Sequence, residues 1–202
     1  METGEMKPFG VLQAAAVHVM NRSKESDHKP FLIGIDGRCA SGKTGFSRLL
    51  ETQYGCAVIH ADNFFLRPEQ RSEQRYATPG GNLDVERLIA EVMEPLKKGI
   101  LPLTYRKFDC VKMELGELVT VPSADTVIVE GSYSLHPKLR DYYDLRIFLD
   151  VTPSVQLKRI EARNGKEKLE VFRNRWIPLE ELYFSGCGGA ENAEMCINTS
   201  LE

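Results

Sequence analysis

Short runs of apolar residues alternate with stretches of helical spacing along most of the chain. Residues 31–35 form a continuous apolar run, the pattern of a strand that is buried on both faces of a sheet. Residues 9–22 and 83–97 instead place apolar side chains three and four positions apart, which predicts helices. Further strands are expected at residues 56–61, 126–129, 145–149 and 193–197, a helix at 154–164, and a small hairpin from 101–105 and 118–121.

This alternation predicts one α/β domain over residues 1–202. Strands that alternate with helices favour a parallel sheet with right-handed crossovers. A length of 202 residues is that of one domain with a sizeable core. Residues 1–29 are expected to form a helix and a loop ahead of the first strand, and the pattern is weakest over residues 166–189, which are charged at first and then rich in glycine.

A phosphate-binding loop is the strongest signal in the chain. The residues from Gly37 to Thr44 fit the pattern G-x-x-x-x-G-K-[ST] without a gap, between a buried strand and an amphipathic helix. Lys43 would place a positive charge on the β- and γ-phosphates, and the Thr44 hydroxyl would bind Mg²⁺. A chance match in a turn is the alternative, but the strand and the helix are the context that the motif requires. The residues expected to hold the nucleotide are Gly37, Arg38, Cys39, Ala40, Ser41, Gly42, Lys43, Thr44 and Gly45.

Two absences separate this chain from other classes of P-loop protein. Neither the N-K-x-D motif nor the D-x-x-G element of GTPase switches occurs in it. The run 126–129 ends in a single acid, Glu130, whereas motor and transporter ATPases usually have two adjacent acids there. The sequence therefore favours a small-molecule kinase.

Two acids lie at the expected carboxyl ends of strands. Asp62 follows residues 57–61, and ligands of parallel α/β sheets bind outside such strand ends. It could accept a proton from an attacking hydroxyl group, or only cap a turn. Glu130 could hold Mg²⁺ or bind a substrate hydroxyl, or be a solvated acid at the strand end.

A basic helix follows the last long strand. Arg159 and Arg163 are four residues apart and share a helix face. Phosphoryl transfer needs cations over the transferring group, and a mobile basic lid supplies them. The alternative is a solvated helix, because acids such as Glu161 and Glu167 are interleaved.

Five stretches resemble the uridine kinase and phosphoribulokinase-like group of P-loop kinases. They are residues 33–44, 61–65, 82–99, 127–131 and 146–150 with the arginine helix, in the family order. The D-x-F-Y element of the family appears here as Asp62-Asn63-Phe64-Phe65, which implies that Asp62 is the catalytic base. The resemblance implies a P-loop NTPase fold, a three-layer α/β/α arrangement with a five-stranded parallel sheet, a small β-hairpin over the acceptor site and a helical lid at about residues 159–185. It also implies ATP and Mg²⁺ as ligands.

The acceptor pocket departs from the family. The stretch 105–110 lacks the His that helps uridine and cytidine kinases to hold the base, and residues 77–82 replace an acidic run. We expect Asp62, Phe65, Tyr105 and Glu130 to meet the acceptor, although Tyr105 could instead pack the hairpin, and Asp84 could be a family residue or a helix cap. A nucleoside is the acceptor that the resemblance implies. Pantothenate, a sugar phosphate or nicotinamide riboside stay open, as does a nucleotide-binding regulator without acceptor chemistry.

The amino-acid composition argues against some classes of binding partner and favours one cellular compartment. A formal net charge of -3 gives no basic surface for nucleic acid, and no apolar run approaches the ~20 residues that span a bilayer. The five cysteines include no C-x-x-C pair, which argues against zinc and disulfides and favours the cytoplasm. Cys39 is expected to be a spacer in the loop rather than a nucleophile, although the nearby helix amides could lower the pKa of its thiol. A homo-oligomer stays compatible with the sequence.

Overall fold

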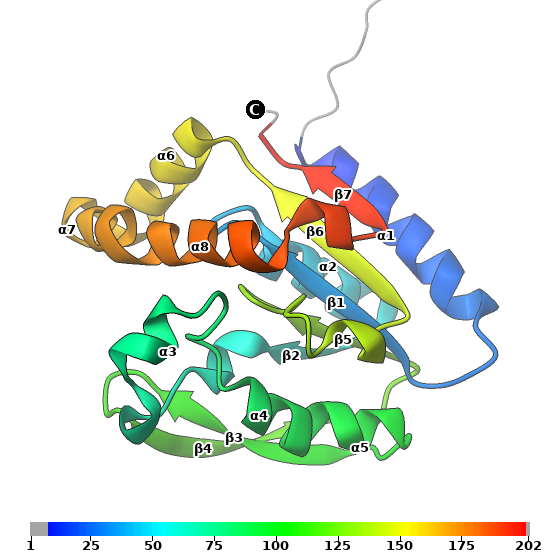
Figure 1. Cartoon of the computed structure of the whole chain (residues 1–202). Coiled ribbons are helices and arrows are strands. Elements are labelled where there is room, and N and C mark those ends of the chain that lie inside the picture. Colours follow the sequence, from blue (N-terminus) through cyan, green and yellow to red (C-terminus); the bar gives the residue numbers. More distant parts are fainter. Residues whose placement is uncertain (1–7, 201–202) are drawn as a thin grey trace, which may run out of the picture.

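The computed structural model describes residues 8–200, and a parallel sheet of five strands runs through its centre (Figure 1). The strands follow the order β2-β5-β1-β6-β7 along the sheet, and all neighbours pair in parallel. Their bounds are β1 Phe31–Gly37, β2 Ala57–His60, β5 Thr126–Glu130, β6 Leu145–Asp150 and β7 Met195–Asn198. All five strands that the apolar runs predicted for the sheet are present.

Two helices, α1 (Pro8–Glu25) and α2 (Lys43–Tyr54), cover one face of the sheet. Phe46 of α2 is fully buried, and it belongs to the same apolar cluster as Ile33 and Ile35 of β1. Side chains two apart on a strand point to the same face, so this cluster takes alternate residues of β1. The remaining β1 residues are buried on the opposite face, which explains the continuous apolar run.

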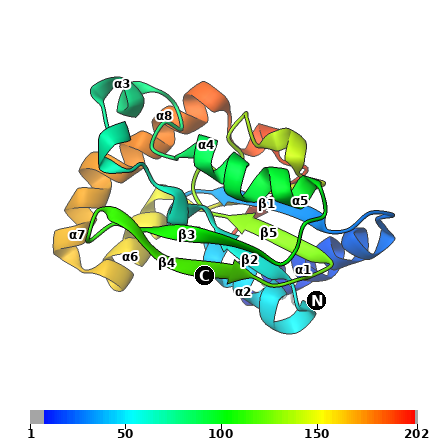
Figure 2. The ribbon, with the colours of Figure 1, turned by 90° about the horizontal axis from the view of Figure 1, so that it is seen from below.

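A helical rod and a β-hairpin cover part of the opposite face (Figure 2). The rod joins α4 (Val85–Leu88), a π-helical turn (Ile89–Met93) and α5 (Glu94–Lys97), and the hairpin consists of β3 (Leu103–Asp109) and β4 (Glu114–Val121). Their apolar residues form one cluster with the sheet, including Leu88, Leu96, Leu103, Val121, Ala57, Ile59 and Val127. The hairpin therefore closes a core and stands beside the edge where β2 ends.

The segment between β6 and β7 forms a group of helices at one end of the molecule (Figure 1). Helix α6 (Pro153–Asn164) leads into α7 (Lys166–Val171) and a π-helical turn (Phe172–Trp176), and α8 (Ile177–Cys187) returns toward the sheet. This is the expected lid region. The remaining elements are α3 (Glu73–Ala77) and short 3₁₀ turns at Ala61–Phe64, Pro68–Gln70, Arg140–Tyr142 and Ala190–Asn192.

The structure confirms the three-layer α/β/α arrangement and shifts some element bounds. The helix expected from residue 83 begins at Val85, because the Asp84 side chain accepts a hydrogen bond from the Arg87 amide at 3.2 Å and caps it. Both hairpin strands are longer than their apolar runs indicated. Among residues 8–200, no helix has both the length and the apolar character needed to cross a bilayer.

Candidate active site

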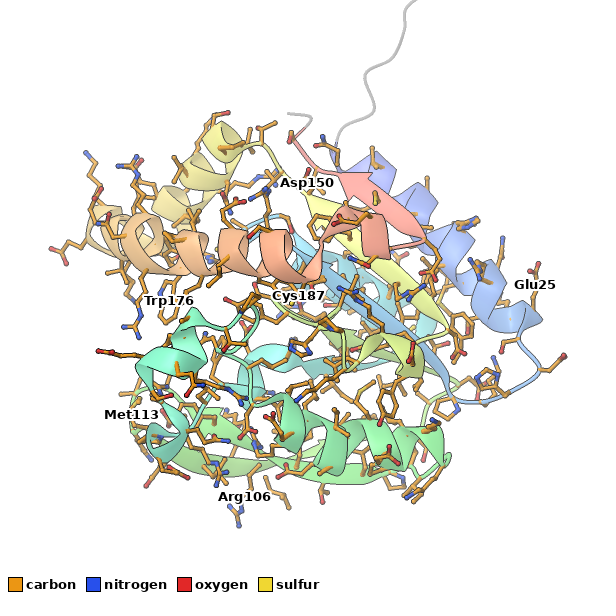
Figure 3. All side chains as sticks on the ribbon, viewed as in Figure 1. Glu25, Arg106, Met113, Asp150, Trp176 and Cys187 are labelled. Atoms are coloured by element: carbon orange, nitrogen blue, oxygen red, sulfur yellow. The ribbon has the colours of Figure 1, made fainter. Side chains whose placement is uncertain are left out.

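Most of the predicted site residues lie together at the carboxyl ends of three strands, β1, β2 and β5. A cavity of about 620 Å³ opens there, between the lid helices on one side and the hairpin on the other. Figure 3 labels residues on both sides, Trp176 on the lid and Met113 between the hairpin strands, and both line the cavity. The other lining residues are Cys39, Ala40, Gly42, Lys43, Thr44, Gly45, Asp62, Phe65, Arg71, Asn82, Cys110, Glu130, Gly131, Ser132, Tyr133, Arg159, Arg163, Phe172, Arg175 and Glu180.

The phosphate loop joins β1 to α2 through left-handed backbone positions. Ala40 has φ 60°, and Gly42 has φ 99° directly before the helix. At Gly37, with φ 140°, an added Cβ would come within 2.0 Å of the Leu149 carbonyl oxygen on β6. Glycine is therefore required where the loop leaves β1, because both the dihedral angle and the close approach exclude a side chain.

Four backbone amides at the start of α2 are available for a ligand. Within residues 8–200, the N–H groups of Gly42, Lys43, Thr44 and Gly45 donate to no hydrogen-bond acceptor, and all four residues line the cavity. The partial positive charge of the helix N-terminus adds to them. The Lys43 ammonium donates to the carbonyl oxygens of Gly37 at 2.7 Å and Arg38 at 3.0 Å. This cradle of amides with an adjacent ammonium suits a polyphosphate.

Two oxygen ligands suited to a divalent cation lie beside the cradle. The Thr44 hydroxyl donates to Oε1 of Glu130 at 3.2 Å, and that carboxylate is only 4% exposed. Mg²⁺ is held in nucleotide-dependent enzymes by one or two hard oxygen ligands together with phosphate oxygens and waters, so these two residues fit it.

His60 orients the same carboxylate from the neighbouring strand. His60 and Glu130 are register partners on β2 and β5, and Nδ1 of the imidazole lies 2.5 Å from Oε1 of the carboxylate. This hydrogen bond raises the pKa of His60, although partial burial opposes the shift. The sequence suggested no partner for His60, because register between separate strands is not visible in it.

Asp62 lies in the 3₁₀ turn directly after β2 and faces the cavity. The turn is fixed from behind, because Arg87 donates to the Asn63 carbonyl oxygen at 2.6 Å and stacks on the Phe64 ring at 4.2 Å. Asp62 is solvent-exposed within the open cavity, but desolvation by the protein around it raises its pKa, as does the nearby Glu130 carboxylate, whereas Lys43 lowers it. A carboxylate of raised basicity is suited to accept a proton.

Both arginines of α6 reach the phosphate loop. Nη1 of Arg159 lies 3.3 Å from the Ala40 carbonyl oxygen, and Arg163 lies 3.9 Å from the Cys39 sulfur. Both line the cavity. Arg159 is half-buried and Arg163 is exposed, and both guanidinium groups lie beside the Gly37–Thr44 loop.

The hairpin contributes less to the cavity than the sequence suggested. Phe65 lines it, but Tyr105 is 2% exposed, packs 4.8 Å from Phe64 and lies outside the lining. Its hydroxyl accepts a hydrogen bond from Asn63 at 2.9 Å, so Tyr105 packs the hairpin. Of the other expected residues, Gly37, Arg38 and Ser41 shape the loop without lining the cavity, and the rest line it.

Two buried acids hold the loop, and sequence reasoning missed both roles. Asp36, at the end of β1, accepts hydrogen bonds from the amides of Gly37 and Leu135 and from the Tyr183 hydroxyl, and burial raises its pKa. Oε1 of Glu180, on α8, accepts a hydrogen bond from the Cys39 backbone N–H at 2.8 Å. Sequence spacing carried no signal for these contacts, because they join segments far apart in the chain.

The thiol of Cys39 differs from the expectation. Burial raises its pKa to about 11, and the Glu180 carboxylate acts in the same direction, although Lys43 and Arg163 oppose it. The suggestion that helix amides lower this pKa is therefore wrong. Cys39 is a spacer in the loop, with a protonated thiol at neutral pH.

Comparisons with known proteins found relatives that are named uridine kinases. No protein-family model matches the chain. The uridine kinase of Staphylococcus carnosus (strain TM300) is 31% identical over 147 residues, which cover 68% of this chain and 69% of that protein. Uridine kinase-like protein 3 of Arabidopsis thaliana is 29% identical over 157 residues, 72% of this chain and 33% of the plant protein, so the match spans about a third of that relative.

The fold is shared with a solved structure. That of a possible uridine kinase from Bacillus stearothermophilus superimposes with a TM-score of 0.68, at 18% identity, and covers 93% of this chain and 97% of that one. At this identity the likeness supports the fold, and function has to be argued from the site.

Proposed function

The chain belongs to the uridine kinase family of P-loop kinases, and from that premise we propose that it transfers the γ-phosphoryl group of ATP to a hydroxyl group of a nucleoside. One observation carries the proposal. A single cavity holds the free amides of the phosphate loop, the Thr44–Glu130 pair and Asp62. A phosphate cradle and a base in one cavity are what phosphoryl transfer to a hydroxyl requires.

Each group has a role in this reaction. The loop amides and Lys43 hold the β- and γ-phosphates, and Thr44 and Glu130 would hold Mg²⁺, which neutralises phosphate charge. Asp62 accepts the proton of the acceptor hydroxyl. The oxygen of that hydroxyl forms a bond to the γ-phosphorus while the bond from the γ-phosphorus to ADP breaks. Arg159 and Arg163 balance the charge on the transferring group, and the lid helices exclude water.

The acceptor end of the cavity leaves room for a compound other than uridine. Tyr105 is withdrawn into the core, and Arg71, Asn82 and Cys110 line this end instead. Pantothenate, a sugar phosphate and nicotinamide riboside are therefore tested beside the nucleosides.

The test is a phosphorylation screen. Purified protein is incubated with labelled ATP, Mg²⁺ and a panel of nucleosides, sugars and vitamins, with D62N as the matched inactive control. We expect one acceptor class to be phosphorylated by the unsubstituted protein and not by D62N. Saturable ATP binding without any phosphorylated acceptor would contradict the proposal and favour a nucleotide-binding regulator.

A further inference from the structure

The backbone N–H and the carbonyl oxygen of one loop residue, Cys39, are held by side chains from two of the lid helices, α8 and α6. Oε1 of Glu180 on α8 accepts the Cys39 N–H at 2.8 Å. Nε2 of Gln156 on α6 donates to the Cys39 carbonyl oxygen at 3.1 Å. Gln156 and Glu180 are 2% and 3% exposed, so these hydrogen bonds are largely shielded from bulk water.

The Glu180 carboxylate connects three further elements of the site. It accepts the Ser132 hydroxyl at 3.0 Å, directly behind the Glu130–Gly131 end of β5. Its second oxygen lies 3.4 Å from Nε2 of Gln156. The Glu180 carboxylate, on α8, therefore contacts the phosphate loop, the segment after β5 and α6.

Neighbouring residues attach the same helix to the same loop. Glu181 pairs with Arg38, and the Tyr183 hydroxyl donates to Oδ2 of Asp36 at 2.8 Å. From the other side, Arg159 of α6 reaches the Ala40 carbonyl oxygen. Movement of the lid helices would consequently move the loop.

A buried carboxylate at a phosphate site needs an explanation. Its negative charge repels polyphosphate, and burial makes the charge costly. Three donors offset part of that cost, yet burial still raises the pKa of Glu180. A residue that only filled space here could be apolar, whereas an acceptor for the Cys39 amide could not.

We propose that Glu180 is a positioning residue, which holds the phosphate loop in its nucleotide-binding shape and couples that loop to the lid helices α6 and α8. The inference rests on the proposed function only in taking the loop as a nucleotide site. The direction in which nucleotide affinity changes when Glu180 is substituted tests this inference, because the charge of the carboxylate and its positioning role affect affinity in opposite directions. Removal of a repelling charge would tighten nucleotide binding, and loss of the amide's acceptor would weaken it.

The experiment compares E180A and E180Q with the unsubstituted protein. E194Q is the matched control, because Glu194 pairs with Arg146 at the surface, outside the cavity. Calorimetry measures the Kd for Mg-ATP, and amide hydrogen exchange is followed over residues 36–46, with thermal unfolding as a measure of global stability. None of these readouts needs the acceptor.

We expect E180A to weaken Mg-ATP binding about tenfold and to speed exchange in the loop selectively. E180Q should fall between the two proteins, because its neutral amide oxygen still accepts the Cys39 N–H but holds it more weakly than the carboxylate does, while the lost charge favours nucleotide. E194Q should match the unsubstituted protein in Kd and in loop exchange. If E180A fails to fold, faster loop exchange in E180Q than in the unsubstituted protein supports the inference, and unchanged loop exchange in E180Q overturns it.

Unchanged or tighter ATP binding in a folded E180A, or unchanged loop exchange, would overturn the inference. Failure of the proposed function looks different. In that case the unsubstituted protein phosphorylates no acceptor, whether or not it binds Mg-ATP, and the exchange rates in E180A still decide whether Glu180 positions the loop.

Discussion

The hydroxyl group of Thr44 donates to the carboxylate of Glu130 at 3.2 Å, across 86 positions of the chain. Thr44 stands in the first turn of α2 and Glu130 at the end of β5. The parallel sheet creates the contact, since β1 and β5 are neighbours and end at the same edge. Two hard oxygen ligands thus meet beside the phosphate loop, where a metal ion would bridge protein and phosphate.

Substitution of Glu130 by glutamine should raise the Mg²⁺ concentration needed for half-maximal activity about tenfold or more. The amide keeps the size of the side chain but removes its charge, and Mg²⁺ prefers carboxylate oxygen. Magnesium titrations of phosphoryl transfer measure the effect. E117Q, at an exposed acid of the hairpin, should leave the curve unchanged, whereas equal curves for E130Q and the unsubstituted protein would exclude Glu130 as a ligand.

Substitution of Lys43 by alanine should lower turnover about 10²- to 10³-fold or more, because it removes the ammonium beside the phosphates. Lys43 is 8% exposed, and its hydrogen bonds to two loop carbonyls aim it across the loop. Circular dichroism should establish that K43A folds. K107A, on the hairpin, is the matched control, and a K43A protein with normal turnover would refute the assigned role.

Substitution of Asp62 by asparagine should lower kcat about 10²- to 10⁴-fold and leave the ATP affinity unchanged, because a general base is lost and the phosphate cradle is not. The pKa of Asp62 is raised, so the unsubstituted enzyme should lose activity on acidification at a higher pH than an ordinary carboxyl group would produce. The residual activity of D62N should not show this loss on acidification, because asparagine does not titrate. An unchanged kcat in D62N would remove Asp62 from the mechanism.

Local pattern was enough to predict most of the fold and that the loop motif, Asp62 and Glu130 would lie at one edge of the sheet. The loop motif is contiguous in the sequence, and the end of each apolar run marks the carboxyl end of a strand. Because parallel strands end at the same edge of the sheet, Thr44, Asp62 and Glu130 are expected to lie close together, and they line one cavity. Glu180 could not be found in this way. It meets Cys39 across 141 positions, from a helix whose approach depends on the packing of the whole lid.

The orientation of Tyr105 shows a second limit of sequence pattern. Strand alternation puts Leu103 and Tyr105 on the same face, but a register shift between Arg106 and Phe108 moves Phe108 onto the buried face as well. Such a bulge leaves no clear mark in the sequence. The bulge follows Tyr105 and does not set its orientation. For Tyr105 the choice between stacking on a substrate and packing the core stayed open because alternation does not show what the Leu103 face of the strand packs against.

The last prediction concerns the acid stability of the fold and His136, in the turn after β5. Its Nδ1 accepts the Lys138 amide at 3.2 Å, which requires the neutral ring. Partial burial, helped by nearby Lys138, lowers the pKa of His136 to about 4. In the unfolded chain His136 has its ordinary pKa of about 6.5, so the unfolded chain binds more protons than the folded protein between about pH 4 and pH 6.5. The stability that neutral His136 contributes is therefore present above pH 6.5 and is lost as the pH falls toward 4.

The variant H136N tests this prediction, because asparagine keeps an acceptor for the Lys138 amide but does not titrate. Urea unfolding at pH 7.5 and pH 5 should show that the unsubstituted protein loses about 2 kcal/mol more than H136N, and equal losses in both proteins would show that His136 does not drive this acid sensitivity.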